Sequence, residues 1–175
     1  RAGNKMKVGD PTLPNTDIGP LIRHAETDRI HEWVQEAVSL GAELITGGEK
    51  ISDSCYQTTV LLNPPDDCTI SRNEVFGPVI CIYEYEDIDD AIAQANSLDV
   101  SFQAAVFSKN IDTCMHAFRH LDASAVMIND HTAFRVDWMP FGGRDESGLG
   151  LGGIPYSMKD MTREKLIVIK SNKLI

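Results

Sequence analysis

The stretch Asn73-Glu74-Val75-Phe76-Gly77-Pro78-Val79 decides how the chain around it is organised. Its Gly-Pro step prevents a helix from continuing, because proline has no N–H and restricts the residue before it. Glu74 and Phe76 are therefore predicted to lie at a rigid corner that leads into a strand. A carboxylate there can accept hydrogen bonds from both hydroxyls of a sugar diol, and the ring can cover a flat heterocycle. On these residues alone, an ordinary turn with a solvated Glu74 and a core Phe76 is the favoured interpretation.

The length and composition are those of a globular protein of about one domain. The chain has 175 residues, of which 42% are hydrophobic and 24% are charged. A net charge of −10 argues against nucleic acid as a partner, because phosphates would be repelled. No apolar run approaches a membrane span, so no membrane association is expected. Four cysteines without CxxC spacing indicate reduced thiols in a cytoplasmic protein: Cys55, Cys68, Cys81 and Cys114.

The first residues, Arg1-Ala2-Gly3-Asn4-Lys5, do not include a methionine or the apolar region of a signal peptide. We therefore expect the sequence to be a fragment of a longer protein.

Hydrophobic periodicity predicts an α/β fold. Apolar residues spaced as on one helix face predict a helix from Pro20 to Leu40, stopped by Gly41. Later helices are expected after caps at Asp87 and Asn110, the second burying Ile111, Cys114, Met115, Phe118 and Leu121. Strands are expected at residues 43–46, 58–62, 79–83, 103–107 and 125–128. The β-α-β-α-β order from residue 79 to residue 128 predicts a parallel sheet covered by helices on both faces, in three layers.

The long loop from Asn129 to Gly153 follows the last of these strands. Ligands of parallel α/β sheets lie beyond the carboxyl ends of the strands, and long loops in compact domains are usually functional or disordered. The aromatic side chains in this loop favour a functional role. Its notable residues are six glycines, Phe134, Arg135, Trp138 and Phe141.

Three further motifs predict no site. Residues 148–153 match GxGxxG literally, but no strand precedes them directly, as a dinucleotide fingerprint requires. His116 and His120 are four residues apart on a helix, yet no third metal ligand is in view, so a solvated face is favoured. Ser147 lacks the GxSxG context of a hydrolase nucleophile. No metal site is therefore expected.

Several motifs together resemble the C-terminal part of the aldehyde dehydrogenase superfamily. They are Asp17-Ile18-Gly19-Pro20-Leu21, Glu74-Val75-Phe76-Gly77-Pro78, Pro140-Phe141-Gly142-Gly143 with Ser147-Gly148, and the final segment from Thr162 to Lys170. They occur in the family's order and at approximately its spacing, over essentially the whole chain. The resemblance implies an NAD(P)+-dependent oxidation of an aldehyde to a carboxylic acid through a cysteine thioester.

The resemblance also implies roles for particular residues. Glu74 corresponds to the glutamate that binds the cofactor ribose, and Phe76 to the aromatic residue against the nicotinamide. Phe141 corresponds to the aromatic residue that lines the substrate funnel. Phe134 lies in the same loop, which varies in length across the family. Arg135 is the only cation between Phe134 and Phe141, so we hypothesise that it binds an anionic group on the aldehyde; a salt bridge to Asp137 or a surface position is about equally favoured.

The family's nucleophilic cysteine, general-base glutamate, oxyanion asparagine and Rossmann domain would all lie upstream of this sequence. Residues 1–161 are thus expected to be the downstream part of an incomplete catalytic domain that is inactive alone. The acidic residue that reads the adenosine ribose would also lie upstream, so these residues do not decide between NAD and NADP as the cofactor. Residues 162–175, with the apolar run from Lys165 to Lys170, are expected to form a strand that joins a neighbouring subunit in a homo-oligomer. A stand-alone binding or oligomerisation module and an inactive homologue are the alternatives.

Overall fold

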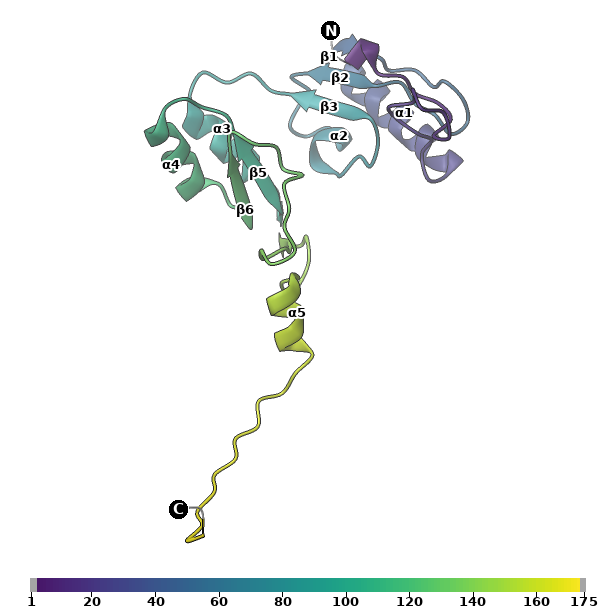
Figure 1. Ribbon diagram of the computed structural model, residues 1–175. Coiled ribbons are helices and arrows are strands. Elements are labelled where there is room, and N and C mark those ends of the chain that lie inside the picture. Colours follow the sequence, from purple (N-terminus) through teal and green to yellow (C-terminus); the bar gives the residue numbers. More distant parts are fainter. Residues whose placement is uncertain (1–2, 174–175) are drawn as a thin grey trace. The chain divides into compact units, whose positions relative to one another are not determined.

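The computed structural model describes residues 3–173, and the chain divides into two units, one ending at Glu86 and the other starting at Asp87 (Figure 1). Each unit is described by itself. The first contains the 3₁₀-helix η1 (Gly3–Lys5), helices α1 (His24–Ser39) and α2 (Thr69–Arg72), and strands β1 (Glu43–Thr46), β2 (Thr59–Leu62) and β3 (Val79–Ile82).

Helix α1 forms the core of the first unit. Ile30, Val34 and Ala37 are fully buried on one face, as their spacing predicted. The helix ends in a Schellman motif: Gly41 has a φ of 114°, and the Ala42 N–H donates to the Ala37 carbonyl at 2.9 Å. The predicted start at Pro20 is wrong, because the helix begins at His24. The residues predicted to form its first turn are not helical, because the Leu21 N–H donates to the Ser54 carbonyl, at 2.7 Å, and not to a carbonyl within the helix.

The sheet of the first unit has the order β1-β2-β3, in which β1–β2 is antiparallel and β2–β3 is parallel. Leu61 of β2 pairs with Cys81 of β3, and both face the core built around α1. Ile80 and Ile82 on the opposite face are exposed. The expectation that this strand is covered on both faces is therefore wrong for the described chain, because helix packing covers one face only.

The second unit holds helices α3 (Ile88–Ala95), α4 (Ile111–His120) and α5 (Ile154–Asp160), and strands β4 (Val100–Ser101), β5 (Gln103–Val106), β6 (Ala125–Ile128) and β7 (Arg144–Asp145). The predicted caps are confirmed, since the side chains of Asp87 and Asn110 accept from backbone N–H groups of the first turns of α3 and α4. Strands β5 and β6 are parallel and are connected through α4, and β4 pairs antiparallel with β7.

Two sequence predictions differ from this arrangement. Ile111 and Phe118 of α4 are 67% and 53% exposed, so the apolar face of the helix is only partly buried, at Cys114 and Ala117. The strands of the described residues also form three small sheets, β1-β2-β3, β4-β7 and β5-β6, and not one parallel sheet. The alternation of helices and strands predicts the parallel β5–β6 pair, but it does not fix which other strands become neighbours.

The segment after α5 has no regular secondary structure from residue 162 to residue 170. The side chains of Leu166, Ile167, Val168 and Ile169 are exposed. The C-terminal strand and the domain boundary at residue 161 thus stay predictions. Within the described residues, no helix is long and apolar enough to cross a membrane.

Candidate functional site

The corner before β3 holds Phe76 in an unusual backbone conformation. Its φ is 48°, in the left-handed region that bulky side chains rarely adopt, and its side chain is 76% exposed. The other described non-glycine residues with positive φ are Asn63, Asn129 and Asp145, types that tolerate this region well. The interpretation of Phe76 as a core residue is therefore wrong. The structure presents its ring to solvent at a backbone cost of about 1–2 kcal/mol.

Glu74 lies two residues earlier and is also exposed. Its carboxylate has no hydrogen bond or ion pair to any residue that the structure describes. Both oxygens are therefore available to hydroxyl donors, and a carboxylate can accept from two of them at once.

Helix α1 fixes the backbone on the N-terminal side of Phe76. The Arg29 side chain donates from Nη2 to the carbonyl of Val75 at 2.6 Å and from Nε to Glu26 Oε2 at 2.7 Å. Its guanidinium also lies over the Trp33 ring, 4.2 Å from the centroid. The hydrogen bond from Arg29 is the main reason why the pKa of Glu26 lies below its ordinary value. Arg29 thereby joins the middle of the helix to a residue 46 positions along the chain.

The same helix also packs against the chain on the C-terminal side of Phe76. A Cβ atom added to Gly77 would lie 2.3 Å from Cδ1 of Ile30, so any larger residue there would force the end of this buried side chain to shift. The Pro78 carbonyl then accepts from the Thr59 N–H at 2.8 Å, which places the following residue in register with β2. The corner is thus held on both sides of the aromatic residue.

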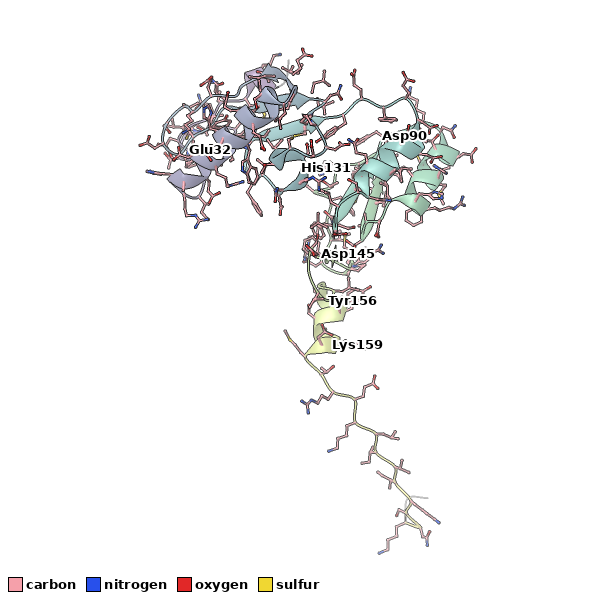
Figure 2. All side chains as sticks on the ribbon, turned by 180° about the vertical axis from the view of Figure 1, so that it is seen from behind. Glu32, Asp90, His131, Asp145, Tyr156 and Lys159 are labelled. Atoms are coloured by element: carbon pink, nitrogen blue, oxygen red, sulfur yellow. The ribbon has the colours of Figure 1, made fainter. Side chains whose placement is uncertain are left out.

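The loop of residues 129–153 lies in the second unit; Figure 2 labels His131 and Asp145 within it. Phe141 is half-buried, and its backbone exchanges two hydrogen bonds with Gly152. Its ring packs edge-on against Phe102, with centroids 4.9 Å apart. The Arg135 guanidinium lies over the same ring, 3.8 Å from the centroid.

Arg135 has no ion pair with a carboxylate in the described part of the chain, so the alternative of a salt bridge to Asp137 is not found there. The structure therefore brings together Arg135 and Phe141 among the predicted substrate residues. Phe134 lines a cavity of about 320 Å³ along β6, together with Asp130 and Met139. Glu74 and Phe76 belong to the other unit.

The cysteines do not have the character of activated nucleophiles. All four are free thiols; Cys55, Cys68 and Cys114 are buried, and burial raises the pKa of the Cys81 thiol. A nucleophilic cysteine needs an accessible thiolate, which burial opposes. His116 pairs with Asp89, and no group of three or more potential metal ligands occurs among the residues the structure describes.

Comparison with known proteins identifies the family. A model described as the aldehyde dehydrogenase family matches residues 1–167. The chain belongs to this family. Among its relatives is a 3-sulfolactaldehyde dehydrogenase of Priestia megaterium, 41% identical over 165 residues, which are 94% of this chain and 34% of that protein. A lactaldehyde dehydrogenase of Methanococcus maripaludis is 36% identical over 94% of this chain and 35% of its own length. The chain thus spans about a third of the length of the relatives it matches.

Solved members of the aldehyde dehydrogenase family share the fold. Aldehyde dehydrogenase 21 from Physcomitrella patens, in complex with the reaction product succinate, superposes with a TM-score of 0.92 at 33% identity, over 99% of this chain and 36% of that one. Glyceraldehyde-3-phosphate dehydrogenase from Methanocaldococcus jannaschii, complexed with NADP, superposes with a TM-score of 0.86 at 32% identity. The match covers 91% of this chain and 34% of that one. The predicted resemblance and the α/β fold class of the aldehyde dehydrogenase catalytic domain are confirmed.

The side chains on α1 that hold the corner were missed by sequence reasoning. Glu26, Arg29 and Trp33 follow the spacing of one helix face, which is a usable signal. The sequence does not show that this face meets a turn more than forty residues away.

Proposed function

We propose that this chain is part of an NAD(P)+-dependent aldehyde dehydrogenase that oxidises an aldehyde to a carboxylic acid. The observation that carries the proposal is the corner at residues 74–78, where a strained aromatic residue is exposed beside an unpartnered carboxylate. A bound NAD(P)+ would supply the acceptor for the hydride of the aldehyde carbon, with water as the source of the second oxygen of the acid and a proton released.

The residues present fit such a cofactor. The exposed Glu74 carboxylate would accept hydrogen bonds from the two hydroxyls of the nicotinamide ribose. The exposed Phe76 ring would cover one face of the nicotinamide and restrict the heterocycle to positions that are productive for hydride transfer. The NADP bound to the glyceraldehyde-3-phosphate dehydrogenase from Methanocaldococcus jannaschii supports this cofactor class. The nucleophile and the general base lie outside this sequence, consistent with the buried thiols found here.

We propose in addition that the aldehyde carries an anionic group. Phe141 lines the substrate funnel and holds the Arg135 guanidinium over its ring, where its N–H donors have no carboxylate partner in the described chain. A guanidinium binds carboxylate, sulfonate or phosphate through paired N–H donors. The relatives named for 3-sulfolactaldehyde and sulfoacetaldehyde, and the structure with succinate, support this substrate class. Phe134 lines the apolar part of the same funnel.

The test is the substrate profile of the complete enzyme. We expect it to reduce NAD+ or NADP+ with sulfoacetaldehyde or succinic semialdehyde and more slowly with neutral aldehydes of similar length. Arg135→Ala should lower kcat/KM for the anionic aldehydes by about 10- to 100-fold, because a hydrogen bond to a charged group contributes about 1.5–3 kcal/mol. Arg119→Ala, at an exposed arginine on α4, is the control. If the ratio of kcat/KM for anionic aldehydes to kcat/KM for neutral aldehydes is unchanged in Arg135→Ala, the proposed role of Arg135 is contradicted. If the unaltered enzyme oxidises no aldehyde, the proposed dehydrogenase activity is contradicted.

We further propose that the complete enzyme is a cytoplasmic homo-oligomer, at least a dimer. Four free thiols support a reducing compartment. The exposed apolar run around Leu166–Ile169 has the character of an unpaired edge, and pairing with the sheet of another subunit would bury it.

A further inference from the structure

The strained backbone conformation of Phe76 must be stabilised by contacts of neighbouring residues, because its exposed ring gains little free energy from burial. Strained residues persist only where the surrounding structure over-determines them. The contacts nearest to Phe76 on either side, at Val75 and at Gly77, come from one face of α1. We call Glu26, Arg29, Ile30 and Trp33 the α1 clamp.

We propose that Arg29 is a positioning residue that sets the conformation of Phe76 for hydride transfer. The inference rests on the proposed role of Phe76 against the nicotinamide. Arg29 does not touch the reacting groups; it acts through the Val75 carbonyl, one peptide bond before Phe76.

The geometry of the α1 clamp calls for an arginine. The guanidinium donates through Nε to Glu26 and through Nη2 to Val75, while its face rests on Trp33. A lysine ammonium has no planar fork and no flat face, so it cannot make all three contacts. The Arg29 side chain is only 27% exposed, which limits competition from water for these contacts.

The two ends of the clamp restrict both sides of Phe76. The bond from Arg29 fixes the orientation of the Val75–Phe76 peptide, and the contact of Ile30 with Gly77 fixes the position of the next residue. Loss of the first contact leaves Phe76 free to relax toward the negative φ values that its side chain prefers. The ring would then leave the position in which it covers the nicotinamide.

The chain offers a matched control. Arg23 donates to the same carboxylate, Glu26, at 2.7 Å, but its side chain is 74% exposed, and among the described residues it has no hydrogen bond or ion pair with residues 74–78. Arg23→Ala therefore removes a cation and one bond to Glu26 without releasing Val75.

The experiment compares Arg29→Ala, Arg29→Lys and Arg23→Ala in the complete enzyme. We expect both Arg29 variants to lower kcat by about tenfold, equivalent to about 1.4 kcal/mol, and to raise the primary isotope effect with a C1-deuterated aldehyde. The KM for the aldehyde should change less than twofold, and Arg23→Ala should match the unaltered enzyme. A crystal structure of Arg29→Ala should show Phe76 at negative φ.

Each other outcome overturns the inference. Arg29 variants that lose only thermal stability, with kcat and the isotope effect unchanged, would show a purely structural residue. Equal effects of Arg23→Ala and Arg29→Ala would assign the effect to Glu26 and not to the bond with Val75. If the unaltered enzyme oxidises no aldehyde, the proposed function fails, and the φ of Phe76 in Arg29→Ala then decides the inference alone: an unchanged positive value overturns it.

Discussion

The contact between Gly77 and Ile30 gives the sharpest test of how the corner is built. Gly77→Ala would place a methyl group 2.3 Å from Cδ1 of Ile30, a side chain with no exposed surface. Extra atoms in a packed interior cost about 1–3 kcal/mol. The φ of Gly77 is not positive, so alanine also reduces the entropy of the unfolded chain, which offsets about 0.4–1 kcal/mol. We expect a net destabilisation of about 1–2 kcal/mol.

A second substitution removes the atom responsible. Ile30→Val deletes Cδ1 and leaves Cγ1, which is 3.4 Å from the added methyl position, an ordinary van der Waals distance. Alone it should cost about 0.5–1.5 kcal/mol. In that background Gly77→Ala should cost almost nothing, which gives a coupling free energy of about 1–2 kcal/mol between the two sites.

The measurement is equilibrium unfolding in urea, followed by tryptophan fluorescence. The chain has two tryptophans: Trp33 packs against the core of the first unit, and Trp138 is exposed in the second. In a Trp138→Phe background, Trp33 reports on the first unit alone. If Gly77→Ala costs the same with Ile30 and with Val at position 30, within about 0.3–0.5 kcal/mol, the reasoning from this close approach is refuted.

Four further outcomes are expected. Glu74→Gln in the complete enzyme should slow the hydride step or raise the KM for the cofactor; unchanged values of both would remove Glu74 from the site. Phe76→Asn should raise the urea stability of the first unit by about 1 kcal/mol, because asparagine tolerates positive φ, and should lower turnover; an unaltered or lower stability would show that Phe76 is not strained. Deleting residues 162–175 should convert the oligomer to monomers or aggregates in light scattering, and an intact dimer would argue against this segment as an interface. The 175-residue chain alone should neither bind NAD at micromolar concentration in calorimetry nor oxidise aldehydes, and either activity would show that it contains more of the site than we infer.

Local sequence patterns predicted the elements of the fold well. The helix with Ile30, Val34 and Ala37 on one face follows from spacing, and the caps at Asp87 and Asn110 follow from side-chain chemistry. Such signals depend on residues a few positions apart. They therefore hold in any tertiary environment of the element.

Pairing and burial could not be predicted in the same way. The periodicity of α4 shows which side chains share an apolar face, but it does not show what covers Ile111 and Phe118, which are exposed. Likewise, the apolar run of β3 resembles a strand buried on both faces, yet Ile80 and Ile82 are uncovered in the described chain. Both features depend on partners distant in sequence, which no local pattern contains.

The corner at Phe76 shows why the site was only partly predictable. The Gly-Pro step indicates a rigid turn, and this much is local. A positive φ at a phenylalanine opposes the intrinsic preference of the residue, so no propensity can predict it. It arises because α1 supplies a hydrogen bond before the ring and a tight contact after it, from residues more than forty positions away. A conflict between local preference and tertiary structure, stabilised by such specific contacts and leaving a large ring exposed, is the pattern expected where function and not stability has selected the residue.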